Sequence, residues 1–145
     1  MLFPEQRRVR IAGPADAATV SALLTEFNGE GLLPAALARR MAEVGGLETA
    51  FLGELEGEPA GVLVLRTVPA LTDAHSWAEI TEMYVRPGYR RQGVGTALIE
   101  AALAYGRACG CREVHLLVDP ANEAGLSFYE AVGFRRDSVE MRRGL

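Results

Sequence analysis

The chain has 145 residues, of which 49% are hydrophobic and 23% are charged, and its formal net charge at pH 7 is −4. This length and composition fit one globular domain over residues 1–145 that needs no disulfide to fold. The negative charge argues against general nucleic-acid binding, and no apolar run approaches the roughly 20 residues of a membrane-spanning helix. The N-terminus lacks a charged leader with an apolar core, so we expect a cytoplasmic protein with neither a nucleic-acid nor a membrane partner.

The chain alternates periodic apolar segments with breaks that contain Gly, Pro or Asn. Apolar residues at helical spacing predict helices, and strict alternation predicts strands. The strand 113–118 is apolar in its second half, as is typical of a central strand covered on both faces. In chain order we expect strand 8–12, helix 14–28, helix 34–44, strands 49–55, 60–68 and 77–85, helix 97–109, strand 113–118, helix 122–132 and strand 134–142.

The two cysteines, Cys109 and Cys111, are one residue apart. This spacing suits neither a disulfide framework nor a zinc ribbon, so we expect free thiols in a reducing compartment and no metal site. No His or Asp lies at a suggestive position beside them, which argues against a covalent acyl-enzyme.

The most informative segment is Arg-Arg-Gln-Gly-Val-Gly-Thr, residues 90–96, between an alternating strand and an Ala-rich helix. The start of a helix presents backbone N–H groups that have no partner within the helix, and these bind phosphate. Gly93 and Gly95 lack a Cβ atom, so the backbone can approach a ligand closely. Arg90 and Arg91 can add charge-assisted bonds to phosphate oxygens. The segment therefore predicts a site for a phosphorylated ligand.

Comparison with known glycine-rich loops narrows this prediction. A P-loop requires a lysine where Val94 stands, and a dinucleotide-binding loop requires a third glycine where Leu98 stands. The pattern Arg/Gln-x-x-Gly-x-Gly/Ala is satisfied in full from Arg90 to Gly95, and it resembles the acetyl-CoA loop of the GNAT superfamily of N-acetyltransferases.

Two further matches support this resemblance. The strand before the loop ends in Tyr-Val-Arg-Pro, residues 84–87, which is similar to the family's hydrophobic-Val-x-Pro ending. Residues 122–129, followed by Gly133 and Phe134, are similar to the family's N-x-x-A-x-x-F/Y-Y…G-F signature, with the alanine displaced to Ala124. The resemblance covers residues 77–136, and before them it rests on the order of the elements.

The resemblance implies an α/β (α+β) fold: a single GNAT-like domain whose mixed, mostly antiparallel sheet has six to seven strands with helices on both faces. It also implies that acetyl-CoA lies along the strand before the loop, where that strand splays from the neighbouring strand 113–118. The resemblance places the cofactor contacts at Met83, Tyr84, Val85, Arg90, Arg91, Gln92, Gly93, Val94, Gly95, Thr96 and Asn122.

Acetyl transfer to an amine benefits from an acid and a base. Tyr129 matches the family's tyrosine near the CoA sulfur and is the expected acid. Glu79 aligns with the glutamate of histone-type enzymes, whereas Glu82 lies nearer to the expected acetyl group. Their spacing puts them on opposite faces of a regular strand unless a bulge intervenes. We favour Glu82 as the base, with Glu79 and a water chain as alternatives.

The resulting hypothesis is an N-acetyltransferase that moves an acetyl group from acetyl-CoA to a primary amine of a small molecule or peptide by direct attack. The alternative is a non-catalytic sensor or scaffold that binds acetyl-CoA, which needs neither the acid nor the base. The acceptor is expected to enter from the side formed by the first two helices, the loop 69–76 and the last strand, where Asp73, Glu79 and Glu82 favour a cationic amine. Members of the family often form homodimers, so we expect one here; the acceptor and the acyl-chain preference stay open.

Overall fold

The computed structural model describes residues 6–145. They form a larger compact unit that ends at His115 and a smaller unit, Leu116–Leu145, and each is described by itself. The single domain over 1–145 stays a prediction. The elements are β1 (Arg7–Ala12), a 3-10 turn (Pro14–Asp16), α1 (Ala17–Asn28), α2 (Pro34–Glu43), β2 (Glu48–Leu55), β3 (Glu58–Val68), β4 (Ser76–Val85), a 3-10 turn (Pro87–Tyr89), α3 (Val94–Ala108), β5 (Cys111–Leu116) and α4 (Glu123–Ala131).

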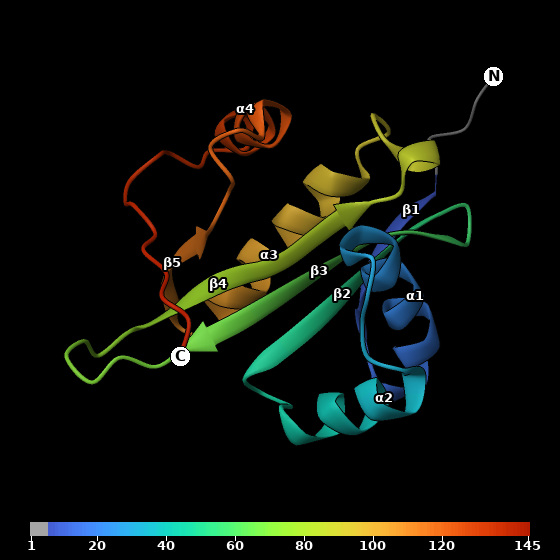
Figure 1. Ribbon diagram of the computed structural model, residues 1–145, viewed down its shortest axis with the longest axis horizontal. Coiled ribbons are helices and arrows are strands. Elements are labelled where there is room, and N and C mark those ends of the chain that lie inside the picture. The colour runs from blue at the N-terminus through green and yellow to red at the C-terminus, as the bar shows by residue number, and fades with distance from the viewer. Residues whose placement is uncertain (1–5) are drawn as a thin grey trace. The chain divides into compact units, whose positions relative to one another are not determined.

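The strands form one sheet in chain order, β1-β2-β3-β4-β5 (Figure 1). The first three neighbouring pairs are antiparallel. A helix, α3, connects β4 to β5, as is typical of a parallel crossover, and this pair makes the sheet mixed. Among residues 6–145, no helix has the length and apolar character needed to span a membrane.

The expected count of six to seven strands is wrong, since the sheet formed by residues 6–145 has five. The difference lies at the C-terminal end, where residues 134–142 form no strand within the described chain. Alternating apolar residues predict a strand because they are expected to bury one face. Here Val139 and Met141 are 89% and 92% exposed, so their alternation buries no such face.

The expectation of a central strand at 113–118 is also wrong. The strand β5 begins and ends two residues earlier than expected and is last in the sheet order. Each of its residues is half-buried or exposed, and Leu117, just beyond it, is 61% exposed. The apolar second half of the predicted strand therefore does not mark a strand covered on both faces.

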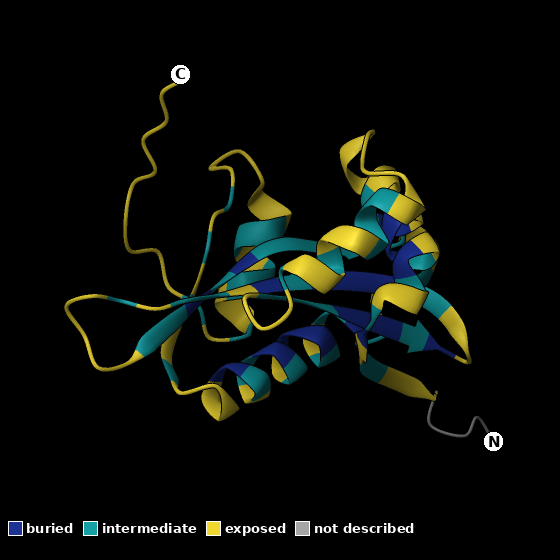
Figure 2. Ribbon diagram, turned by 90° about the horizontal axis from the view of Figure 1, so that it is seen from below, coloured by how far each residue is buried: buried dark blue, intermediate teal, exposed yellow. Residues whose placement is uncertain are grey.

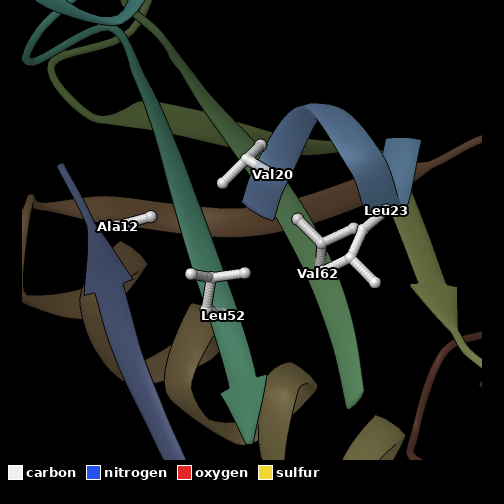
Figure 3. Close-up of a cluster of buried hydrophobic side chains, with 5 residues drawn as sticks. All are labelled: Ala12, Val20, Leu23, Leu52 and Val62. Carbon is white, nitrogen blue, oxygen red and sulfur yellow. The ribbon is translucent and has the colours of Figure 1, made fainter. Parts of the chain in front are cut away.

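One face of the sheet packs against α1 and α2. Val20 and Leu23 of α1 contact Leu52 of β2 and Val62 of β3, and all four are at most 3% exposed (Figure 3). Leu37 and Met41 of α2 pack against the same cluster. The apolar stripes predicted for both helices thus meet the sheet on one side.

The opposite face packs against α3, whose buried residues include Leu98 and Ile99. Two glycines of the sheet allow this helix to come close: a Cβ atom on Gly53 would lie 2.9 Å from Val94, and one on Gly61 would lie 3.2 Å from Leu98. Figure 2 shows the buried residues gathered along the sheet and on the helix surfaces that face it. This close packing holds the first turn of α3 against the sheet.

Candidate functional site

The loop between β4 and α3 has two residues in left-handed backbone conformations. Arg91 has a φ angle of 60° and Gly93 has one of 81°. A positive φ is uncommon for a residue other than glycine and costs free energy, so it marks a constrained backbone. Successive amides in such a loop can converge as a concave anion-binding nest.

The first turn of α3 completes this arrangement. The first amide that bonds within the helix is that of Ala97, which donates to the Gly93 carbonyl at 3.0 Å. The amides of Val94, Gly95 and Thr96 precede it and have no helical acceptor to reach, as at every helix start. They lie at the positive end of the helix dipole, which favours an anion. The start of α3 thus presents three amides that an anion could reach, and the phosphate site itself stays a prediction.

Arginines surround the loop, and two of them brace it. The Arg90 Nε atom donates to the Val85 carbonyl at 3.0 Å, which ties the loop to the end of β4. Arg7 of β1 donates through Nη1 to the Gln92 carbonyl at 3.1 Å. The Arg91 side chain is exposed. Three guanidinium groups thus lie on or against this loop, where they add positive charge beside the helix start.

The strand before the loop contains a β-bulge. The register shifts between Ile80, which lies opposite Leu65, and Glu82, which lies opposite Val64, so Thr81 is the extra residue. Glu79 lies opposite Arg66. Residues 64 and 66 of β3 point to the same face, and directly paired residues share a face. The bulge therefore brings Glu79 and Glu82 to the face that α1 and α2 cover.

The two glutamates have different partners on that face. Glu79 accepts from Arg66 at 2.7 Å in an ion pair, and its side chain is 17% exposed. Glu82 accepts from the Asn28 side chain at 3.4 Å, a long hydrogen bond from the end of α1. The Arg66 guanidinium thus forms an ion pair with the Glu79 carboxylate, whereas Glu82 has a neutral partner.

A cavity of about 610 Å³ opens beside the bulge. Thr81 and Glu82 line it from β4, and Leu37, Arg40 and Met41 line it from α2. This volume is typical of small-molecule sites. Glu79 and Asp73, which we expected to share this acidic side with Glu82, do not line the cavity, and Asp73 lies 3.6 Å from Arg112.

The end of β4 continues past β5. Trp77, the second residue of β4, stacks on His115 with ring centroids 4.6 Å apart, and β5 ends one residue later. Residues 83–85 therefore lie beyond the last strand, and their backbone groups on that side do not pair with β5. The Tyr84 side chain turns to α1, where it stacks on Phe27 and donates to Glu26 at 3.1 Å. The splayed pair itself stays a prediction.

The smaller unit holds the other two predicted residues, Asn122 and Tyr129. The Asn122 side chain accepts from the Gly125 amide at 2.9 Å, which confirms it as the cap of α4. Tyr129 is half-buried between Phe128 and Phe134, with ring centroids 5.2 and 5.9 Å away. Burial raises the pKa of the Tyr129 phenol, so it stays protonated at neutral pH. The roles of both residues toward a ligand stay predictions.

Sequence reasoning missed Arg40, which lines the cavity, and Asn28, which donates a hydrogen bond to Glu82. Arg40 lies three residues after Leu37 and four before Val44, so it shares the apolar stripe of α2. A charge on such a stripe is a signal that could have been noticed. That this stripe borders a cavity follows only from the packing of α2 on the sheet.

Comparisons with known proteins agree with this geometry. The family model described as Acetyltransferase (GNAT) family matches residues 20–134. An uncharacterized N-acetyltransferase of Methanocaldococcus jannaschii is 34% identical over 90 residues, which are 61% of this chain and 40% of that protein. The chain therefore aligns with less than half of that relative's length.

Two other proteins are similar to this chain, one in sequence and one in structure. Glucosamine 6-phosphate N-acetyltransferase of Trypanosoma brucei brucei is 33% identical over 96 residues, 66% of this chain and 63% of that protein. The crystal structure of an aminoglycoside N-acetyltransferase in complex with CoA superposes with a TM-score of 0.83 at 20% identity and covers 99% of both chains. At that identity the structural likeness establishes the fold.

Proposed function

The chain belongs to the acetyltransferase (GNAT) family, and from this premise we propose that it is an acetyl-CoA-dependent N-acetyltransferase. It transfers the acetyl group to a primary amine of a small molecule or peptide. The names of its relatives support both substrates: one similar structure holds CoA, and a relative in Trypanosoma brucei brucei is an N-acetyltransferase of an amino sugar phosphate.

The loop 90–96 supports the assignment of the donor. The pyrophosphate of acetyl-CoA binds the amides of residues 92–96, and Arg90 and Arg91 contact its oxygens. The acetyl-bearing arm lies along Met83, Tyr84 and Val85, where backbone groups beyond β5 can pair with its amides. Asn122 contacts the same arm. When bound, acetyl-CoA supplies a thioester carbonyl that an amine can attack.

The transfer requires three proton movements. Glu82, in the cavity, takes a proton from the incoming ammonium, directly or through water, so that the nitrogen lone pair becomes free. The C–N bond then forms and the C–S bond breaks, while Tyr129, whose phenol is protonated at neutral pH, gives its proton to the departing sulfur. The attacking nitrogen loses its second proton to the Tyr129 phenolate through water, which leaves a neutral amide and restores the phenol. Glu79 is the second choice of base because Arg66 already occupies its carboxylate.

The observation that carries this proposal is a bulged strand that lines a cavity through Thr81 and Glu82 and then leads, through a loop with two left-handed residues, to the start of a helix. The test incubates the protein with acetyl-CoA and a panel of polyamines, aminoglycosides, amino acids and peptides. Products are detected by mass spectrometry, because the exposed Cys109 would itself react with thiol reagents. We expect acetylated amine and free CoA in equal amounts.

A Tyr129→Phe variant distinguishes an enzyme from a sensor. In an enzyme the loss of the proton donor lowers kcat by about 10² or more and leaves acetyl-CoA binding intact. If no amine is acetylated above background by the wild type, while acetyl-CoA still binds, the protein is a non-catalytic sensor or scaffold instead.

A further inference from the structure

The charges of the cavity identify the class of the acceptor. Resting on the function proposed above, we infer that the acceptor is an amine that also carries an anionic group, a carboxylate or a phosphate, on an apolar body. Glu82 faces the amine and Arg40 binds the anionic group. The sequence led us to expect only that the site favours a cationic amine, and the anionic group is a further requirement.

The walls of the cavity are mostly apolar. Val20 and Leu24 of α1, Leu37 and Met41 of α2, and Val64 of β3 all line it. An apolar wall is stabilised by an apolar ligand surface, while the few polar groups of a site fix the ligand's orientation. The body of the acceptor is therefore hydrocarbon-like, and charged side chains of the cavity bind its two ends.

Four charged residues line the cavity, and their signs cancel: Arg40, Glu48, Arg66 and Glu82. Arg66 is already engaged, because it pairs with Glu79 at 2.7 Å and also lies in the field of Glu48. These three side chains together carry one negative charge. Outside this group, one anionic and one cationic side chain of the lining can meet a ligand, namely Glu82 and Arg40.

The Arg40 guanidinium is available for an anion. Its ion pair among the described residues joins its Nη1 atom to Glu43 at 3.9 Å, the outer limit of such a contact, and both side chains are more than half exposed. An exposed pair of this kind is weak. Guanidinium donors match the oxygens of a carboxylate or phosphate in a forked geometry, which a water-exposed glutamate at 3.9 Å does not satisfy.

The charges of Glu82 and Arg40 then favour one of three classes of acceptor: diamines, simple alkylamines, or amines with an anionic group. A diamine would place its second ammonium beside Arg40, and the repulsion would oppose binding. A simple alkylamine would leave Arg40 without a partner. An amine with a carboxylate or phosphate satisfies both ends of the cavity, so it is the preferred substrate.

The experiment compares kcat/KM for straight-chain probes of equal length that carry an amine at one end and a methyl, carboxylate, phosphate or second amine at the other. We expect the carboxylate or the phosphate probe to exceed the methyl probe by about 10- to 100-fold, the value of a charge-assisted bond. The diamine should be the poorest substrate. The ratio between the carboxylate and phosphate probes tells which anion the site takes.

Variants of two adjacent arginines make the test specific. Arg40→Ala should abolish the preference over the methyl probe, and Arg40→Glu should make the diamine the best substrate. Arg39→Ala is the matched control, since Arg39 lies on the same helix but does not line this cavity, and it should keep the wild-type preference.

The outcomes separate this inference from the proposed function. If the wild type acetylates all four probes equally, or if Arg39→Ala and Arg40→Ala change the preference to the same extent, the inference is overturned and the N-acetyltransferase stands. If no probe and no amine of the wider panel is acetylated, the proposed function fails, and the inference fails with it.

Discussion

At the scale of single residues, the functions of two similar glutamates depend on what surrounds them. Glu79 and Glu82 share a strand and, because of the bulge at Thr81, also a face of the sheet. The Arg66 guanidinium binds Glu79. Glu82 lines the cavity, and its hydrogen-bond partner among the described residues is the neutral Asn28 amide. A base must be free to take a proton from the acceptor, which favours Glu82.

Replacing Glu82 by glutamine should therefore lower kcat by about 10² to 10⁴, the usual contribution of a placed base. The KM for acetyl-CoA should change little, because the donor contacts that we propose are those of residues 83–85, the loop 90–96 and Asn122, and Glu82 is not among them. Steady-state kinetics with the best amine measures both. Glu79→Gln is the matched control and should cost much less activity; a larger loss for Glu79→Gln would make Glu79 the base.

Asp16 offers a test of stability at the same scale. Arg10 donates to its two carboxylate oxygens at 3.0 and 2.8 Å, and the Gly13 amide donates at 2.9 Å. The hydrogen bonds from Arg10, and then the one from Gly13, hold the pKa of Asp16 below its usual value. Asp16→Asn should lower the free energy of unfolding at pH 7 by about 1–2 kcal/mol.

The sign of the pH dependence follows from that lowered pKa. The stabilisation is present above the unfolded-state pKa of Asp, about 3.9, and it is lost as the pH falls through the lower folded-state pKa. The difference between wild type and Asp16→Asn, measured by urea unfolding, should therefore shrink below about pH 4. A difference that stays constant from pH 7 to pH 3 would show that the charge of Asp16 does not stabilise the fold.

At the scale of elements, the site depends on the connection from β4 to α3. Gly93 precedes α3 with a φ angle of 81°, a conformation that side chains disfavour. Gly93→Ala should cost about 1–2 kcal/mol of stability and weaken acetyl-CoA binding, because the first amides of α3 would shift. Urea unfolding and calorimetry measure the two effects.

Gly88→Ala is the control for this change. Gly88 lies in the same loop, its φ angle is not positive, and a Cβ atom there would have open space around it. We expect nearly wild-type stability and binding. Equal effects of the two substitutions would mean that the left-handed conformation of Gly93 is not what holds the site.

Much of the element order could be predicted from sequence, and the exceptions have physical causes. Local signals located both early helices, the hairpin and the Asn122 cap, because spacing and capping act within a few residues. The bulge at Thr81 depends on the register with β3, a contact distant in sequence. The edge position of β5 and the exposed segment 134–142 likewise depend on which partner a strand finds.

At the scale of the whole molecule, the sequence identified the donor better than the acceptor. The main part of the proposed donor site is one contiguous segment, residues 90–96, whose pattern can be recognised without knowledge of the fold. The cavity that we propose for the acceptor combines side chains from α1, α2, β3 and β4, and Arg40 lines it only because α2 packs on that face. The predicted roles of Asn122 and Tyr129 in the smaller unit, and the predicted homodimer, also concern the whole molecule.

Both proposals depend on the binding of acetyl-CoA by the loop 90–96, which isothermal titration calorimetry of the full chain measures. For the wild type we predict saturable one-to-one binding whose affinity falls with added salt, since phosphate contacts are screened. For Arg91→Ala, which loses a charge-assisted bond, we predict at least about 10-fold weaker binding. No saturable heat with acetyl-CoA, or the same affinity in both proteins at every salt concentration, would show that this loop does not bind acetyl-CoA.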